Sequence, residues 1–247
     1  MIIQPPSRPC LDADQPVSLD IANRLLLALP PEVLAAIMPQ LDLVELQRGQ
    51  LLAEVGHTVR HVFFVNRGLV SLMQPLRDGR SADVATVGME GLADPCTLLG
   101  LDHAILDVVV HVPGEAYRLS RPHLMALIAQ HPAAKALLEH YMQWLMGQMA
   151  QTAACNRLHG LGQRCARWLL TAHDNARGDD FLLTQDFLAL MLGAQRSSVA
   201  AVTATFRDAG LIDYRAGHMH IKSRAGLRNA ACECYGAIRT QLAAILP

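Results

Sequence analysis

The sequence predicts an α+β fold made of a jelly-roll-like β-roll, a long helix and a C-terminal winged helix-turn-helix. Three patterns predict it. Short apolar segments punctuated by glycines fill 41–119, a helical pattern runs over 132–156, and two short amphipathic helices with a hairpin follow from 184 onward. The expected parts are a loose tail (1–20), a β-roll domain (21–131), the long helix (132–157) and a winged domain with an extra C-terminal helix (158–247).

Composition fits a globular protein with a substantial buried core. The chain has 247 residues, of which 51% are hydrophobic, enough for one large domain or two modest ones. No run of 18 apolar residues occurs, and the first residues lack the basic and apolar regions of a secretory signal. We therefore expect a cytoplasmic protein without a membrane partner.

Charge is divided unevenly along the chain. Residues 1–154 carry 10 Lys and Arg against 15 Asp and Glu, whereas residues 155–247 carry 11 against 7. The basic residues of the second part are almost all arginine, which makes bidentate contacts to phosphate and guanine. This asymmetry is typical of an acidic sensor joined to a phosphate-binding module.

The first half predicts two short helices and then a series of strands. Leucines, valines and isoleucines at helical spacing over 25–38 are interrupted at Pro30-Pro31, so two helices fit better than one. The Asp78-Gly79 pair favours a tight hairpin turn. Glycines separate short segments with the composition of β-strands, as in a small barrel or jelly roll. These segments are 44–46, 50–53, 62–65, 68–73, 82–87 and 105–112.

Along the long helix, one face repeats at alternating spacings of four and three residues. This is the heptad pattern of two helices packed along their length, and it predicts a homodimer. The alternative is a helix lying on its own β-roll through Leu137, Tyr141 and Trp144. The predicted dimer seam consists of Leu138, Met142, Leu145, Met149, Thr152 and Asn156.

Cysteine and histidine spacings predict neither a metal site nor a cofactor. No Cys-x-x-Cys pair is present, and the spacings match neither a structural zinc site nor an iron–sulfur run. We expect buried thiols, with Cys232 and Cys234 as an alternative redox pair. The six cysteines are Cys10, Cys96, Cys155, Cys165, Cys232 and Cys234.

The most informative stretch is 183–212. Thr184 is placed to cap a helix that has Asp186 in its first turn, and Gly193 can adopt the positive φ of a sharp turn. A second helix begins near Gln195. Two short helices joined by a glycine-containing turn are the helix-turn-helix arrangement of DNA-binding proteins.

Burial of Val199, Val202 and Phe206 turns the N-terminal end of the second helix outward, where such a helix meets base edges. Two β segments around Ala216-Gly217 then form a wing. A helical hairpin inside an enzyme is the alternative, but the helices, the wing and the basic balance agree. The predicted DNA contacts are Thr184 and Gln185 to phosphates, Gln195, Arg196, Ser197, Ser198 and Ala201 at the bases, and Arg215 and His218 on the wing.

Over about residues 20–223 the sequence resembles the Crp/Fnr family, most specifically in 183–212 and then in the glycines of the β-roll. The resemblance implies a homodimer with a β-roll sensor, a long dimer helix and a winged helix that binds double-stranded promoter DNA. RNA polymerase is a further candidate partner. Arg196 matches the family's recognition arginine, but Ser197 stands where Glu is frequent and Ala201 where a second arginine is usual. The resemblance therefore leaves the operator sequence open.

The sensor departs further from the family. Members that bind cyclic AMP hold its phosphate with a Gly-Glu pair and an Arg-Ser pair, whereas this chain has no arginine in the corresponding regions, 90–94 and 103–105. A desolvated phosphate without a cation is costly, so we expect no tight binding of cyclic AMP, and the effector is unknown. Neither an N-terminal cysteine cluster nor a distinctive histidine spacing supports iron–sulfur or haem. The candidate effector pocket consists of Glu90, Gly91, Leu92, Asp94, Met142, Leu145 and Met149.

The leading hypothesis is a cytoplasmic, homodimeric, sequence-specific transcription regulator. The alternative is a ligand-binding or protein-interaction module with weak DNA affinity. An enzyme is disfavoured, because the sequence shows no nucleophile–base pair, metal triad or phosphate loop.

Overall fold

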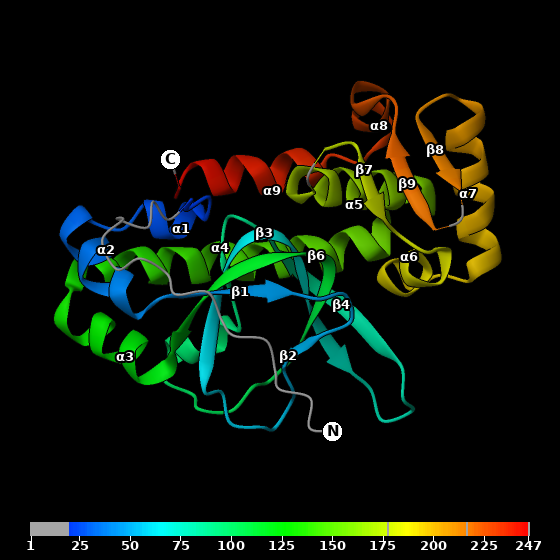
Figure 1. Cartoon of the computed structure of the whole chain (residues 1–247). Helices are drawn as coiled ribbons and strands as arrows, with labels where there is room; N and C mark the ends of the chain where they lie inside the picture. The colour runs from blue at the N-terminus through cyan, green and yellow to red at the C-terminus, as the bar shows by residue number, and fades with distance from the viewer. Residues whose placement is uncertain (1–19, 177, 216, 247) are drawn as a thin grey trace, which may run out of the picture.

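The computed structural model describes residues 20–176, 178–215 and 217–246. The predicted tail falls outside these residues except for Asp20. Figure 1 shows the strands of the β-roll packed beside a long helix, α4 (Pro132–Leu158), with two short helices and a hairpin at one end of the molecule. A C-terminal helix runs back along α4 toward the N-terminal helices.

Two short helices precede the β-roll, as the paired prolines predict. Asn23 caps the first through its side-chain oxygen, which accepts from the Leu26 amide at 2.9 Å. Pro31 occupies the first position of the second, where a missing N–H costs nothing. These elements are α1 (Arg24–Leu27), α2 (Pro31–Ile37) and the 3-10 turn η1 (Met38–Gln40).

The β-roll is built on an antiparallel sheet in the order β1-β6-β3-β4, with β2 paired to β6 and β5 paired to β3. The Asp78-Gly79 pair lies in the turn between β3 and β4, and Gly79 has φ +83°. The strands are β1 (Asp42–Leu46), β2 (Leu51–Ala53), β3 (His61–Pro75), β4 (Ser81–Val87), β5 (Leu92–Ala93) and β6 (Asp107–Ser120); the 3-10 turn η2 (Pro95–Leu99) follows β5.

Two strands differ from their predicted extents. The predicted segments 62–65 and 68–73 form one strand, β3, because Gly68 takes φ +93° and lets the backbone pass close to β6. A Cβ on Gly68 would lie 2.5 Å from the Val112 carbonyl oxygen. The last predicted strand was placed too early: β6 begins at Asp107 and continues to Ser120.

A helix that the sequence reading missed follows directly. In α3 (Arg121–Gln130), Ser120 caps the N-terminus by accepting from the His123 amide, and a proline occupies the first turn. The sequence Ser-x-Pro is typical of a helix N-terminus and could have been used to predict this helix.

The C-terminal part contains the predicted helix-turn-helix and wing, and two terminal helices where one was expected. The break between those two lies at 231–233. The small sheet has the order β7-β9-β8, and its first strand was not predicted. The elements are α5 (Leu161–Asn175), β7 (Asp180–Leu182), α6 (Gln185–Leu192), α7 (Arg196–Asp208), β8 (Ile212–Arg215), β9 (His218–Ile221), α8 (Arg224–Ala230) and α9 (Cys234–Ala243).

The C-terminal segment that contains α9 joins the core of the β-roll to the core of the helix-turn-helix part. Leu242 and Leu246 are buried in the core of the β-roll, whereas Tyr235 packs into the core of the helix-turn-helix part. The Arg24 guanidinium donates to the Leu246 carbonyl at 3.1 Å and fastens the end of the chain to α1. Among the described residues, no single helix is long and apolar enough to cross a membrane; the pair α6–α7, bent by 107°, meets that test only jointly.

Candidate nucleic-acid interface and interdomain pocket

Helices α6 and α7 are set by the local signals that predicted them. The Thr184 hydroxyl accepts from the Phe187 amide at 3.3 Å and caps α6. Gly193 ends α6 in the left-handed conformation, with φ +56° and ψ +40°. Helix α7 then begins at Arg196, with Gln195 as its N-cap residue. The N-terminal end of α7 therefore leaves a sharp turn, as the recognition helix of a helix-turn-helix does.

One face of α7 is buried and the other is open. Val199, Thr203 and Phe206 are buried beneath the helix, while Val202 is only half-buried. The Thr203 hydroxyl donates to the carbonyls of the preceding turn, so its burial costs no unmet hydrogen bond. The predicted base-contacting residues are all exposed: Gln195, Arg196, Ser197, Ser198 and Ala201.

Arg196 is free to change partners. Its side chain is 66% exposed and forms an ion pair with Asp186, Nε to Oδ1 at 3.2 Å. Exposed ion pairs contribute little to stability, so a guanine or a phosphate can replace Asp186 at small cost.

The wing places its two predicted residues opposite each other. Arg215 and His218 pair across β8 and β9, and both are exposed. Within the described residues, the Arg215 guanidinium bonds Asp213, two positions earlier on β8, at 3.3 to 3.4 Å. His218 and His220 share one face of β9, with Met219 buried on the other, as expected for a strand.

The N-terminus of α6 is docked on the β-roll, a contact the sequence reading did not find. Arg48 donates to the Thr184 hydroxyl at 3.2 Å, and its guanidinium lies 5.5 Å from the centre of the Phe187 ring. The His111 ring lies 4.4 Å from the same ring. Burial, with a smaller effect of the Arg48 charge, lowers the pKa of His111 to about 3, so this histidine is neutral at physiological pH. Thr184, a predicted phosphate contact, is thus already engaged, and Gln185 beside it is half-buried.

The predicted effector pocket is largely filled by protein. The Tyr141 side chain is buried, and its hydroxyl bonds both the amide and the carbonyl of Leu92 at 3.1 Å. A Cβ on Gly91 would lie 2.2 Å from the Tyr141 hydroxyl, so the glycine is needed for this close contact. Leu92 and Leu145 belong to the core of the β-roll.

Asp94 lies beyond this contact, and within the described residues no basic side chain shifts its pKa. It is buried in the left-handed conformation at φ +59°, and Oδ2 has no hydrogen-bond partner within the described residues. Burial raises the pKa of Asp94 to about 6, opposed only by a backbone hydrogen bond from Cys96. An anion here would meet a buried carboxyl group.

A cavity of about 330 Å³ lies instead between the β-roll, α4, α5 and α9. Of the predicted pocket residues, Glu90 alone lines it. Three buried polar atoms in its wall have no partner within the described part of the chain: Oδ1 of Asp83, Nε of Arg167 and Nε1 of Trp168. Burial raises the pKa of Asp83 to about 7, opposed by a Ser71 hydrogen bond and the Arg167 charge. The cavity has the size and mixed polarity of a small-ligand site.

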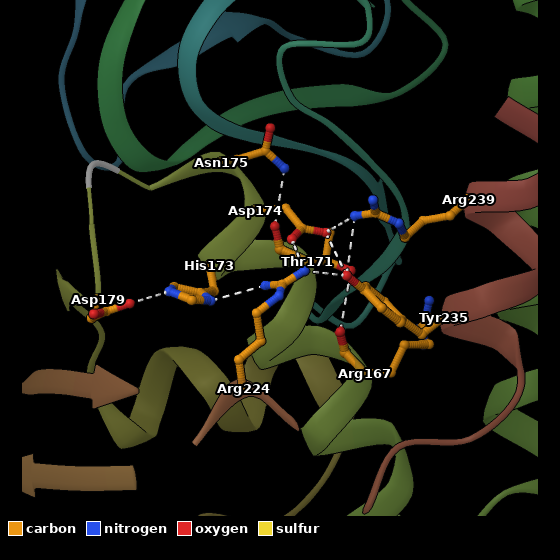
Figure 2. Close-up of polar contacts among 9 residues, drawn as sticks. All are labelled: Arg167, Thr171, His173, Asp174, Asn175, Asp179, Arg224, Tyr235 and Arg239. Carbon is orange, nitrogen blue, oxygen red and sulfur yellow. Dashed lines mark hydrogen bonds and ion pairs between the residues drawn. The ribbon is translucent and has the colours of Figure 1, made fainter. Parts of the chain in front are cut away.

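Asp174 closes one side of this cavity and ties three helices together (Figure 2). Its Oδ1 accepts from Arg224 of α8 at 2.5 Å. Its Oδ2 accepts from Arg239 and from the Tyr235 hydroxyl of α9, both at 2.8 Å. His173 extends the network from Arg224 to Asp179. The C-terminal helices are therefore fastened to α5 by charged hydrogen bonds.

The predicted dimer seam faces inward. Leu138, Leu145 and Thr152 are buried within this one chain. Tyr141 and Trp144 are also buried, in the core of the β-roll. The Trp144 indole donates to the Ile238 carbonyl of α9 at 3.2 Å. The heptad pattern is therefore explained by the packing of α4 on its own β-roll, the alternative given above, and on α9; Leu138, Leu145 and Thr152 are not available to a second chain in this structure. Met142 is buried and Met149 half-buried, and Asn156 is exposed beside Arg164, which donates to it.

Comparisons with known proteins agree with this architecture. A cyclic nucleotide-binding domain model matches residues 43–131, and a Crp-like helix-turn-helix domain model matches residues 163–230. Together they cover more than half of the chain. No curated protein sequence matches it.

Three solved structures illustrate the likeness in fold. FixK2 from Bradyrhizobium japonicum is 14% identical with a TM-score of 0.64, over 78% of this chain and 98% of that one. TTHB099, a CRP-family transcriptional regulator from Thermus thermophilus, is 22% identical with a TM-score of 0.62, over 76% and 96%. The c-di-GMP responsive regulator CLP from Xanthomonas campestris is 15% identical with a TM-score of 0.61, over 78% and 100%.

The two matched domains occur in the same order as the β-roll and the helix-turn-helix in the structure. Helix α4 lies between them, and α7 has one exposed face. With its cyclic nucleotide-binding domain and its Crp-like helix-turn-helix, the chain belongs to the Crp/Fnr family of transcription regulators.

Proposed function

We propose that the protein binds promoter DNA as a homodimer and reads sequence with the N-terminal end of α7. The observation that carries this proposal is the exposed group of Arg196, Ser197 and Ser198 above a buried face, at the start of the helix that follows the Gly193 turn. Arg196 reads a guanine through two hydrogen bonds. The serines bond bases or phosphates, and Ala201 offers an apolar contact.

Phosphate contacts come from both sides of α7 in this proposal. Arg215 and His218 of the wing reach one stretch of backbone. Gln185 and Thr184 face another at the front of α6, where helix N–H groups favour an anion. Since Thr184 accepts from Arg48, binding there requires α6 to exchange a β-roll contact for a phosphate.

The homodimer uses the outward face of α4 in place of the predicted seam. A second series of positions on α4 lies one residue after each member of the predicted seam and has the same spacing of four and three residues. Every residue of this second series is exposed. Met146 at its centre is 64% exposed, an unusual state for a large apolar side chain in the middle of a long helix. Small residues beside it let a second α4 approach closely. The series is Glu139, Gln143, Met146, Ala150, Ala153 and Arg157.

We further propose that the β-roll does not bind cyclic AMP tightly. Tyr141 occupies the space beside Leu92, and among the described residues no basic side chain shifts the pKa of the buried Asp94 carboxyl, which would repel a phosphate when ionised. Calorimetric titration with cyclic AMP should show no saturable heat at micromolar concentration. Saturable micromolar binding, abolished by a substitution at Asp94 or Gly91, would contradict this part of the proposal.

The DNA-binding proposal is tested by selecting sites from a random duplex library with the full-length protein. We expect an inverted repeat, with half-site centres about 10 base pairs or a multiple apart, because a two-fold dimer presents two recognition helices. Binding should weaken steeply with added salt. Failure to enrich any sequence, together with salt-insensitive retention, would favour a protein-interaction module instead.

A further inference from the structure

Three cysteines and a histidine that are remote in sequence meet at the end of α4. Cys155 lies in the last turn of that helix and His159 follows directly as its C-cap residue. Cys232 and Cys234 flank the start of α9. One potential ligand atom from each of the four residues lies within 4.8 Å of all the others. Sequence spacing alone could not show this, because 77 residues separate Cys155 from Cys232.

The distances suit one tetrahedral ion. The Sγ atoms of Cys155 and Cys232 are 3.5 Å apart, and Cys234 Sγ lies 3.4 Å from His159 Nδ1. Zinc–sulfur bonds of about 2.3 Å place two ligands about 3.8 Å apart in a tetrahedron. Small side-chain movements within the present cluster would therefore complete the site.

The surroundings are those of a closed structural site. Cys155, Cys232 and Cys234 are buried, and together they form a cluster of their own. Gln151 donates to Cys234 Sγ at 3.0 Å. His159 Nε2 lies 4.0 Å from Glu233 Oε1. A carboxylate that accepts from the second ring nitrogen commonly orients a ligating imidazole, and a small movement of Glu233 would bring it into that position. Four protein ligands leave no open coordination position, as in structural rather than catalytic zinc sites.

We propose that Cys155, His159, Cys232 and Cys234 bind one Zn²⁺ ion, which joins the end of α4 to the start of α9. Soft thiolates and an imidazole in tetrahedral arrangement select zinc over calcium or magnesium. The ion would hold two helices together. Helix α9 packs along α4 and reaches the β-roll core, so an ion at its start fixes the C-terminal helices across both halves of the molecule. The proposal also revises the expectation of isolated buried thiols.

The first test is the metal content of the full-length protein, purified under reducing conditions after expression with added zinc. We expect about one zinc per chain, measured by inductively coupled plasma mass spectrometry. Cys234→Ser and Cys155→Ser should lose the metal, whereas Cys96→Ser, a buried cysteine outside the cluster, should retain it. His159→Gln, at a partly exposed position that tolerates a polar side chain, should weaken binding without preventing folding.

The second test is titration of the metal-free protein with Co²⁺ alone. A tetrahedral thiolate site gives strong visible absorption, which should saturate near one equivalent and disappear in the Cys232→Ser variant. Metal-free wild-type protein that gives no such absorption would overturn the proposal. A Cys155–Cys232 disulfide found by peptide mapping of the protein as purified, with no bound metal, would also overturn it and leave a redox pair. None of these readouts depends on DNA binding.

Discussion

At the residue scale, Asp83 couples the interdomain cavity to pH. Burial raises its pKa to about 7, from an ordinary value near 4. Below about pH 4 the carboxyl is protonated in both folded and unfolded chains, so it costs nothing. Between about pH 4 and pH 7 the unfolded chain releases this proton and the folded chain keeps it, so stability falls as pH rises. Above about pH 7 the full cost of a buried carboxylate remains.

Asp83→Asn is therefore expected to stabilise the protein at pH 8 and to have little effect near pH 4. The gain in free energy of unfolding should be about 2–4 kcal/mol, because each unit of pKa difference corresponds to about 1.4 kcal/mol and the raised pKa already includes the opposing charge of Arg167. Urea unfolding at several pH values measures it. Asp78→Asn is the control, since Arg80 lowers the pKa of that exposed carboxyl and no such gain should appear. A pH-independent difference would contradict the role of Asp83.

At the scale of elements, Tyr141 joins α4 to the first residue of β5. Its hydroxyl meets both backbone groups of Leu92, and Gly91 makes room for the ring. Tyr141→Phe leaves a buried N–H and a buried carbonyl without this partner, which should cost about 1–3 kcal/mol in thermal or urea unfolding. Tyr117→Phe should cost less, because the hydroxyl of that buried residue makes no hydrogen bond within the described residues. If both variants lost the same stability, the hydroxyl of Tyr141 would not be what holds α4 to β5.

Helix caps and glycine turns in the sequence predicted the helices whose ends they determine. The Thr184 cap and the Gly193 turn fix α6 and the start of α7, so the sequence sufficed for both helices and for the exposed face of α7. The heptad pattern of α4 was not sufficient to predict which surface this helix packs against. An apolar stripe is the same whether its partner is another chain or the chain's own sheet, and here Leu138 and Leu145 pack inward.

Contacts between distant segments were beyond sequence reasoning. The Arg48–Thr184 hydrogen bond depends on how two domains dock, and no local pattern encodes it. Likewise, Cys155 and Cys232 meet only because α9 returns along α4.

At the scale of the whole molecule, the outward face of α4 is expected to set the oligomeric state. Ala150→Glu places like charges at the centre of the proposed interface, where two copies of the helix meet. Sedimentation equilibrium should show a dimer for the wild type and a shift of about tenfold or more toward monomer for this variant. Ala129→Glu, on the exposed side of α3, should remain dimeric. A wild-type monomer, or an Ala150→Glu dimer as stable as the wild type, would place the interface elsewhere.

The central claim is that the start of α7 reads DNA bases, and Arg196 tests it most directly. Mobility-shift titrations on a selected site and on a scrambled duplex should be compared for the wild type, Arg196→Ala and Arg60→Ala, the last an exposed arginine of the β-roll. Arg196→Ala should lose about 10- to 100-fold in affinity for the selected site and most of its preference over the scrambled one. Arg60→Ala should behave as the wild type. If Arg196→Ala bound and discriminated like the wild type, α7 would not be the recognition helix.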